Sequence, residues 1–235
     1  MARITRKELK SDKFALEVEH TVTLFEEHKQ ELLRYGGILV VVAILVAGFL
    51  VYRQRQHTAR EAALGRAILV AQTPVGAPQP GSTTVSSFPT QQVKDEATLK
   101  VFTDLKNQYP GSAEGEIAQY FLGSIQADQG KFAEAEKNFQ QAASSSDEKY
   151  ASLSKLSLGE ALFAQGKADQ GKKVLEDLAA HPTIFVSKDE ALLAEAQALI
   201  PTQPAEARKI LDSLRNKQGA TSQVALTLYG RLPPQ

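Results

Sequence analysis

The feature that most constrains the fold of this 235-residue chain is a set of residues that recurs after 36 positions in its C-terminal half. Each copy contains an apolar residue followed by glycine, a second glycine seven residues later, and then small or apolar residues at helical spacing. The first copy holds Leu122, Gly123, Gly130, Phe132, Ala135, Phe139 and Ala142, and the second holds Leu158, Gly159, Gly166, Ala168, Gly171, Leu175 and Leu178. Self-similarity at a period of about 20–50 residues is typical of solenoids. The repeat therefore predicts an α-solenoid of stacked helix pairs.

The residue types in each copy fit two packed helices joined by a turn. Gly123 and Gly159 allow the first helix to approach the second closely. Gly130 and Gly166 are placed to end the first helix, where a left-handed cap favours glycine. We expect the large apolar residues of the set to fill the space between the helices. We expect its alanines to provide a face of small side chains where helices lie close together.

This pattern resembles the tetratricopeptide repeat (TPR), a helix-turn-helix unit of about 34 residues. The first copy matches seven positions of the TPR pattern, and the second retains Leu158, Gly159 and Gly166 but replaces three others. No stretch of the chain alternates between polar and apolar residues for long enough to predict a sheet. The predicted fold class is therefore all-α, with a degenerate TPR-type helical-repeat domain.

The likeness to TPR units extends more weakly to either side of the two copies. Residues 102–112 resemble the end of a repeat, with Leu105 facing inward, and residues 204–214 resemble a second helix, with Ala207 and Leu211 facing inward.

Three signals predict helix starts within the repeat region. Ser145–Glu148 and Ser187–Glu190 have the sequence of capping boxes. Pro204 suits the first position of a helix, where its missing N–H is not needed.

A second constraint is an uncharged span from Tyr35 to Tyr52, bounded by Arg34 and Arg53. As a helix, its 18 residues would extend about 27 Å at ~1.5 Å per residue, close to the ~30 Å hydrocarbon core of a bilayer. A buried core helix is disfavoured because the span is apolar on all sides and the rest of the chain offers no partner large enough. A cleaved signal peptide is disfavoured because the preceding region is too long and arginines follow the span. The span predicts a single-pass transmembrane helix.

The chain divides into five predicted segments. They are an amphipathic tail (1–34), the transmembrane helix (35–52), a helix leaving the membrane (53–72), a Pro/Ser-rich linker (73–93) and the TPR-like domain (94–235). The tail either docks at a membrane surface or on a partner, or it only extends the membrane helix; both interpretations stay open. The helix leaving the membrane has one apolar face, formed by Ala63, Leu64, Ala67, Ile68 and Ala71.

Composition excludes several functional classes. Lys+Arg is 27 and Asp+Glu is 27, so the chain lacks the positive field of a nucleic-acid binder. The absence of cysteine excludes a disulfide scaffold, a thiolate metal site and a cysteine nucleophile. The four histidines have no metal-site spacing, and the chain has neither a phosphate-binding loop nor a nucleophile elbow. We expect no enzymatic activity, no catalytic, cofactor-binding or metal site, and no small-molecule substrate.

A protein-binding surface remains, since stacked helix pairs build a groove that holds a peptide or a partner helix. Some TPR domains grip a C-terminal carboxylate with basic residues on the first helices of their repeats. The predicted helix 112–129 contains Glu114, Glu116 and Asp128 and no basic residue, which disfavours such a carboxylate clamp.

The whole arrangement resembles the family of membrane-anchored TPR ancillary subunits of the bacterial SecYEG translocon. The stretches VEHTVTLFEEHKQ, before the span, and REAALGRAILVAQ, after it, are similar in kind to that family. The resemblance implies a protein-export accessory in the bacterial inner membrane, with its tail in the cytoplasm and its TPR domain in the periplasm. It also implies translocon subunits, periplasmic chaperones or exported chains as protein partners. The alternative is a general membrane-tethered TPR scaffold for assembly of an envelope or division complex.

Charge alone does not fix the orientation of the predicted anchor. The tail holds seven Lys/Arg residues, whereas within 20 residues of the span two precede it and four follow it.

Overall fold

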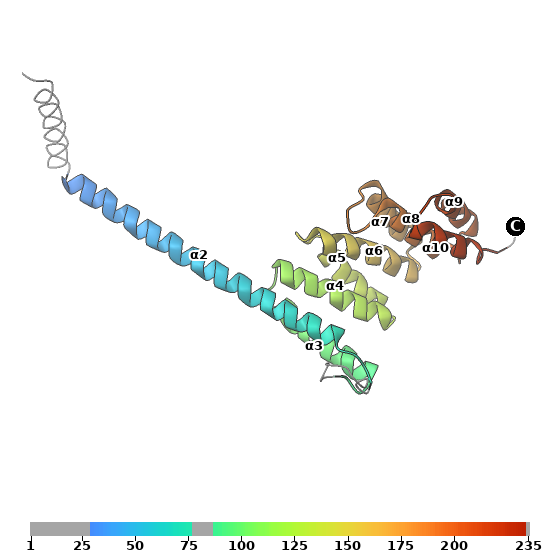
Figure 1. Ribbon diagram of the computed structural model, residues 1–235, viewed down its shortest axis with the longest axis horizontal. Helices are drawn as coiled ribbons and strands as arrows, with labels where there is room; N and C mark the ends of the chain where they lie inside the picture. The colour runs from blue at the N-terminus through green and yellow to red at the C-terminus, as the bar shows by residue number, and fades with distance from the viewer. Residues whose placement is uncertain (1–28, 77–86, 234–235) are drawn as a thin grey trace, which may run out of the picture. The chain divides into compact units, whose positions relative to one another are not determined.

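The computed structural model describes residues 29–76 and 87–233, and in these ranges it is helical, with one isolated β-bridge and no strand. The helices in these ranges are α2 (Lys29–Gln72), α3 (Gln91–Gln108), α4 (Ala113–Asp128), α5 (Phe132–Ala142), α6 (Glu148–Ala164), α7 (Ala168–Ala180), α8 (Lys188–Leu199), α9 (Pro204–Arg215) and α10 (Ala220–Tyr229) (Figure 1). The predicted all-α fold class is confirmed. The predicted amphipathic tail falls mostly on residues 1–28, outside the described residues.

The chain forms two compact units, Met1–Ala59 and Arg60–Gln235. In the first unit, every large apolar side chain from Tyr35 to Tyr52 is more than half exposed. Such a surface is favourable in hydrocarbon and unfavourable in water. This part of α2 is long and apolar enough to cross a membrane, as predicted for the anchor.

The second unit consists of stacked helix pairs. Helix α4 packs with α5, α6 with α7 and α8 with α9, and each pair contacts the next. In addition, α4 contacts α6, α6 contacts α8, and α8 contacts α10, whereas the backbones of the outer helices α5, α7 and α9, all of them described, do not approach one another. We call α4, α6, α8 and α10 the inner row, because they form the continuous layer of the stack.

The last turns of α2 and helix α3 supply the first helix pair. Ala67 is buried in one cluster with Phe102 and Leu105 of α3 and with Ala118 and Leu122 of α4. The predicted apolar face of α2 packs against this cluster through Ala63, Leu64, Ile68 and Ala71. The compact repeat unit therefore begins at Arg60 rather than at residue 94.

The described ends of the predicted linker lie together within this first pair. Val75 and Phe88 form the isolated bridge, and the backbone N–H of Gly76 donates to the carbonyl oxygen of Phe88 at 2.9 Å. Helix α3 begins at Gln91, so the last three residues assigned to the linker are helical.

Glycine ends the first helix of the second and third pairs. Gly130 and Gly166 have φ values of +73° and +76°. After α4, the N–H of Gly130 donates to Ala127 O at 2.9 Å and that of Lys131 donates to Gln126 O at 2.8 Å. This Schellman arrangement satisfies carbonyl groups at the helix end, and it recurs after α6 at Gly166.

Two of the three predicted helix starts are confirmed. Ser187 and Glu190 form a capping box at α8, and Pro204 is the first residue of α9. The capping box predicted from Ser145 is wrong, because the N-cap of α6 is Asp147, whose side chain accepts a hydrogen bond from the backbone. The Ser145 hydroxyl accepts from the N–H of Asp147 at 3.2 Å and so belongs to the preceding turn.

Candidate functional site

The structure extends the 36-residue spacing to the α8–α9 pair. Helices α5, α7 and α9 begin at Phe132, Ala168 and Pro204, each 36 residues after the last. The next three pattern positions are buried in every copy: Ala135, Gly171 and Ala207; Phe139, Leu175 and Leu211; Ala142, Leu178 and Leu214. Leu122 and Leu158 are also buried, and Phe132 and Ala168 are half-buried.

The glycines of the pattern lie where helices approach closely. A Cβ atom on Gly123 would be 2.7 Å from Cε1 of Phe139, and one on Gly159 would be 2.5 Å from Cγ of Leu175. A Cβ on Gly171 would lie 2.9 Å from the carbonyl oxygen of Gly159. These residues position the inner row against the outer helices.

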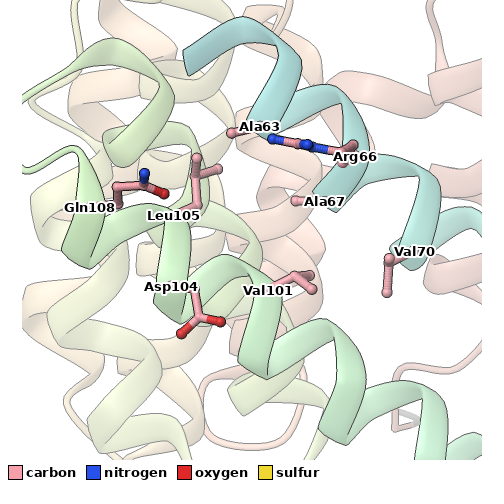
Figure 2. A pocket seen from close by; sticks show the side chains of 8 residues that line it. All are labelled: Ala63, Arg66, Ala67, Val70, Val101, Asp104, Leu105 and Gln108. Atoms are coloured by element: carbon pink, nitrogen blue, oxygen red, sulfur yellow. The ribbon is translucent and has the colours of Figure 1, made fainter. Parts of the chain in front are cut away.

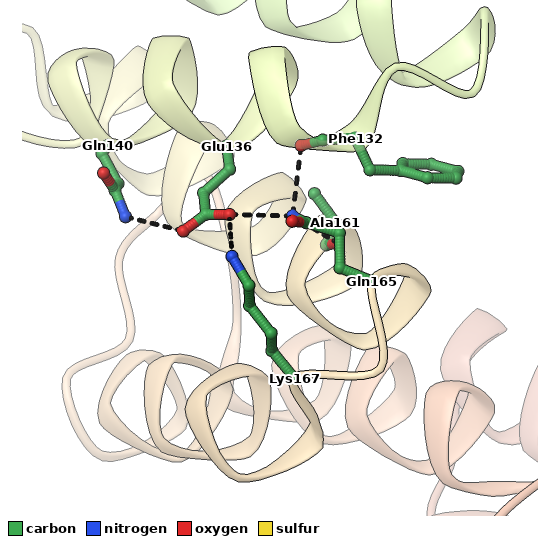
Figure 3. A network of polar contacts seen from close by, with 6 residues as sticks. All are labelled: Phe132, Glu136, Gln140, Ala161, Gln165 and Lys167. Carbon is green, nitrogen blue, oxygen red and sulfur yellow. Dashed lines mark hydrogen bonds and ion pairs between the residues drawn. The ribbon is translucent and has the colours of Figure 1, made fainter.

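Polar contacts join successive outer helices to the pairs that follow them. The carboxylate of Glu136 in α5 accepts hydrogen bonds from Lys167 at 2.6 Å and from Gln165 at 2.9 Å (Figure 3). The hydrogen bond from Lys167 holds the pKa of Glu136 below its usual 4.5. Lys172, which occupies the next repeat's equivalent of Glu136, contacts Glu206 of α9 in the same way. These contacts tie the outer helices α5 and α7 each to the pair that follows.

An aromatic cluster lies between the inner helices α4 and α6. The ring of Tyr120 is 5.4 Å from Phe121 and 5.5 Å from Tyr150, and Phe121 is 5.8 Å from Tyr150. Phe121 also stacks on the fully buried Phe102 at 4.6 Å. The Tyr120, Phe121 and Tyr150 side chains are half-buried, so a partner can reach the exposed part of rings that the core already holds in place.

Aliphatic side chains continue this surface along the inner row. Leu153 and Leu156 of α6 and Leu192 of α8 are half-buried and pack on one core cluster. We define the inner strip as Tyr120, Phe121, Tyr150, Leu153, Leu156 and Leu192.

The charged residues near the inner strip do not favour binding of a peptide's C-terminal carboxylate. Helix α4 contains neither lysine nor arginine, and Lys155 of α6 pairs with Asp177 at 3.7 Å. Lys149 lies over the ring of Tyr150, 5.4 Å from its centre. Glu114 is buried and faces Arg60 at 3.5 Å, which ties α4 to α2. The strip is thus mainly apolar.

Sequence reasoning missed a buried carboxyl group in α8. Glu195 is 3% exposed and lies among Lys172 and Glu176 of α7 and Glu206 of α9. Burial raises the pKa of Glu195 to about 7. The signal was present in the repeat, since Glu195 stands 36 residues after Gly159. Over residues 29–76 and 87–233, no group of three or more potential ligands could hold a metal ion.

The stacked pairs, the shared spacing and the inner strip define an α-helical repeat protein with a surface for other proteins. Residues 32–193 match the tetratricopeptide repeat-like domain. Because this match covers more than half of the chain, the protein belongs to the tetratricopeptide repeat-like domain family. Folds of this kind typically mediate protein interactions rather than catalysis. No curated protein and no solved structure gives a match.

Proposed function

We propose that this chain is a membrane-anchored, non-enzymatic interaction protein whose inner strip binds an apolar segment of a partner protein. The observation that carries the proposal is the half-buried aromatic cluster of Tyr120, Phe121 and Tyr150 on the inner row. Aromatic side chains bury large areas and are enriched among residues that dominate binding energy. Their contacts with buried rings reduce the entropy lost on binding.

The finer proposal is a role beside the bacterial Sec translocon. Its support is the sequence resemblance of the tail, anchor and repeat array to the translocon's ancillary TPR subunits. In this role the anchor lies in the inner membrane, and the repeat unit lies in the periplasm. The partners are translocon subunits, periplasmic chaperones or exported chains. A general membrane-tethered scaffold for an envelope or division complex is the second candidate, favoured by the lack of any residue motif specific to translocation.

Partner identification with matched variants tests the binding surface. The full chain would be purified from membranes in mild detergent and its partners identified by mass spectrometry. Replacing Tyr150 and Leu153 with serine should remove the partner, whereas serine at the exposed Lys137 and Gln141 of α5 should retain it. Equal recovery with both double variants, at unchanged helical content, would exclude the inner strip as the binding site.

The recovered partners also separate the two candidate roles. Translocon subunits and periplasmic chaperones would support the export role, and division or envelope-assembly proteins would support the scaffold.

A cysteine reporter tests the proposed topology. The chain contains no cysteine, so Ser146→Cys, on the exposed turn before α6, places a single thiol on the repeat unit. A thiol reagent that reaches the periplasm but does not cross the inner membrane should label this variant in intact cells. Labelling only after the inner membrane is broken would place the repeats in the cytoplasm and contradict the export role.

A further inference from the structure

An open pocket of about 240 Å³ lies between the last turns of α2 and helix α3 (Figure 2). Its apolar lining comes from Ala63, Ala67 and Val70 of α2 and from Val101 and Leu105 of α3. Ala63 and Ala67 also belong to the apolar face of α2 that packs on the first cluster, so the pocket lies at the edge of that face. We call this pocket and its rim the first-pair groove.

The two ends of the helix stack differ in how their apolar surface is covered. At the C-terminal end, α10 covers the last pair, and its Ala225 and Leu228 are buried in the cluster formed with α8 and α9. At the first pair, no described helix covers the groove, and Leu69, which precedes the groove-lining Val70 in sequence, is 65% exposed. Terminal repeats of soluble solenoids usually present a polar outer face. The apolar groove at this end therefore has the character of an interface.

The two walls of the groove carry opposite charges. Arg66 on α2 is exposed and forms no ion pair with any residue that the structure describes. Asp104 stands on the α3 wall, and its side chain is 62% exposed. Its pair with Lys100 is an exposed i,i+4 contact, which contributes little and is easily exchanged.

We infer that the first-pair groove is the interface between two copies of this chain. In a two-fold arrangement each patch meets its own equivalent, so every contact occurs twice. The α2 wall of one copy then faces the α3 wall of the other, and Arg66 pairs with Asp104 on both sides of the axis. The alanine and valine side chains of the two grooves bury one another between these pairs.

Charge reversal in the full chain tests the interface. Light scattering in mild detergent should give the mass of a dimer for the native chain. Arg66→Glu or Asp104→Arg alone should weaken the dimer at least tenfold, because each reversal places like charges opposite each other twice. The two reversals together should restore it. Lys173→Glu, which reverses an exposed charge on α7, is the control and should leave the mass unchanged.

Crosslinking gives an independent readout that does not depend on altered charges. Val70→Cys, in the lining of the groove, should be joined to its copy by a short bis-maleimide in native membranes, whereas Lys173→Cys should not. A monomeric native chain, a dimer indifferent to both charge reversals, or equal crosslinking at the two positions would each overturn the inference. Circular dichroism of every variant identifies any loss of dimer that comes from misfolding, and in that case the crosslink in the otherwise native chain decides.

Discussion

Replacing Glu195 with glutamine should stabilise the repeat unit above pH 7 and have little effect near pH 4. Glu195 is 3% exposed within α8. Burial raises the pKa of its carboxyl to about 7; Glu176 adds to this increase, Lys172 opposes it, and Glu206 adds a smaller contribution. Lys172 also contacts Glu206, so its charge is shared and compensates Glu195 only in part.

The sign and size of the effect follow from linkage between protonation and folding. The pKa of Glu195 is about 7 in the folded chain against its usual 4.5, so the folded state holds the proton more tightly than the unfolded state does. Stability is therefore greatest below pH 4.5, falls as the pH rises to 7, and is level above it. At ~1.4 kcal/mol per tenfold change in proton affinity, the ionised carboxylate costs roughly 3 kcal/mol. Because glutamine must bury a polar amide in place of the protonated carboxyl group, we expect a gain of about 1–3 kcal/mol at pH 8.

Urea unfolding of residues 60–235, followed by circular dichroism between pH 4 and 8, measures this difference. The native sequence should lose stability across this window relative to Glu195→Gln, and the two should converge toward pH 4. Glu176→Gln is the control: it removes an exposed carboxylate from the same cluster and should retain most of the pH-dependent loss. A pH-independent difference, or a glutamine variant less stable at pH 8, would show that Lys172 fully compensates the buried charge and would refute the reasoning.

Three further outcomes test the packing of the repeat unit. Gly159→Ala should cost about 1–2 kcal/mol in urea unfolding, because its Cβ would be 2.5 Å from a side-chain carbon, whereas Gly65→Ala, with nothing within 4 Å, should be neutral or stabilising. Glu136→Gln should cost about 1 kcal/mol at pH 7; because the folded pKa of Glu136 is lowered, this cost should disappear as the pH falls through that pKa. A fragment of residues 94–235 should melt at a lower temperature than one of residues 60–235, because it lacks the α2 turns that cover the first cluster.

Features that depend on backbone conformation and local packing could be predicted from the sequence. The sequence predicts left-handed caps at Gly130 and Gly166 because few other residues adopt positive φ without strain, and both glycines have a positive φ. Gly123 and Gly159 were assigned to close helix contacts, and a Cβ on either would overlap the outer helix. In these cases the residue type and its repeat spacing carry the structural information.

Features that depend on competition between neighbouring residues, or on contacts between distant segments, were harder to predict from the sequence. Ser145 and Asp147 are both good N-cap residues, and the choice between them depends on where the preceding turn ends. In the inner strip, Tyr120 shares the 36-residue spacing with Leu156 and Leu192, but its contact with Tyr150, on a different helix, follows from no repeat position. The first-pair groove depends on the packing of α2 against α3. Residues 73–90 separate these helices in the sequence, and the repeat does not specify the length of that connection.

Glu195 shows how far a repeat pattern can specify energetics. The same position is glycine in the two preceding pairs, where it allows a close contact with the outer helix. A glutamate there indicates that the α8–α9 pair departs from this contact, and that much is visible in the sequence. Its consequence depends on Lys172 and Glu206, which belong to different pairs and meet only when α7 and α9 stack on α8. The pattern thus locates the position, whereas the stacking of three helices determines whether its charge stabilises or destabilises the fold.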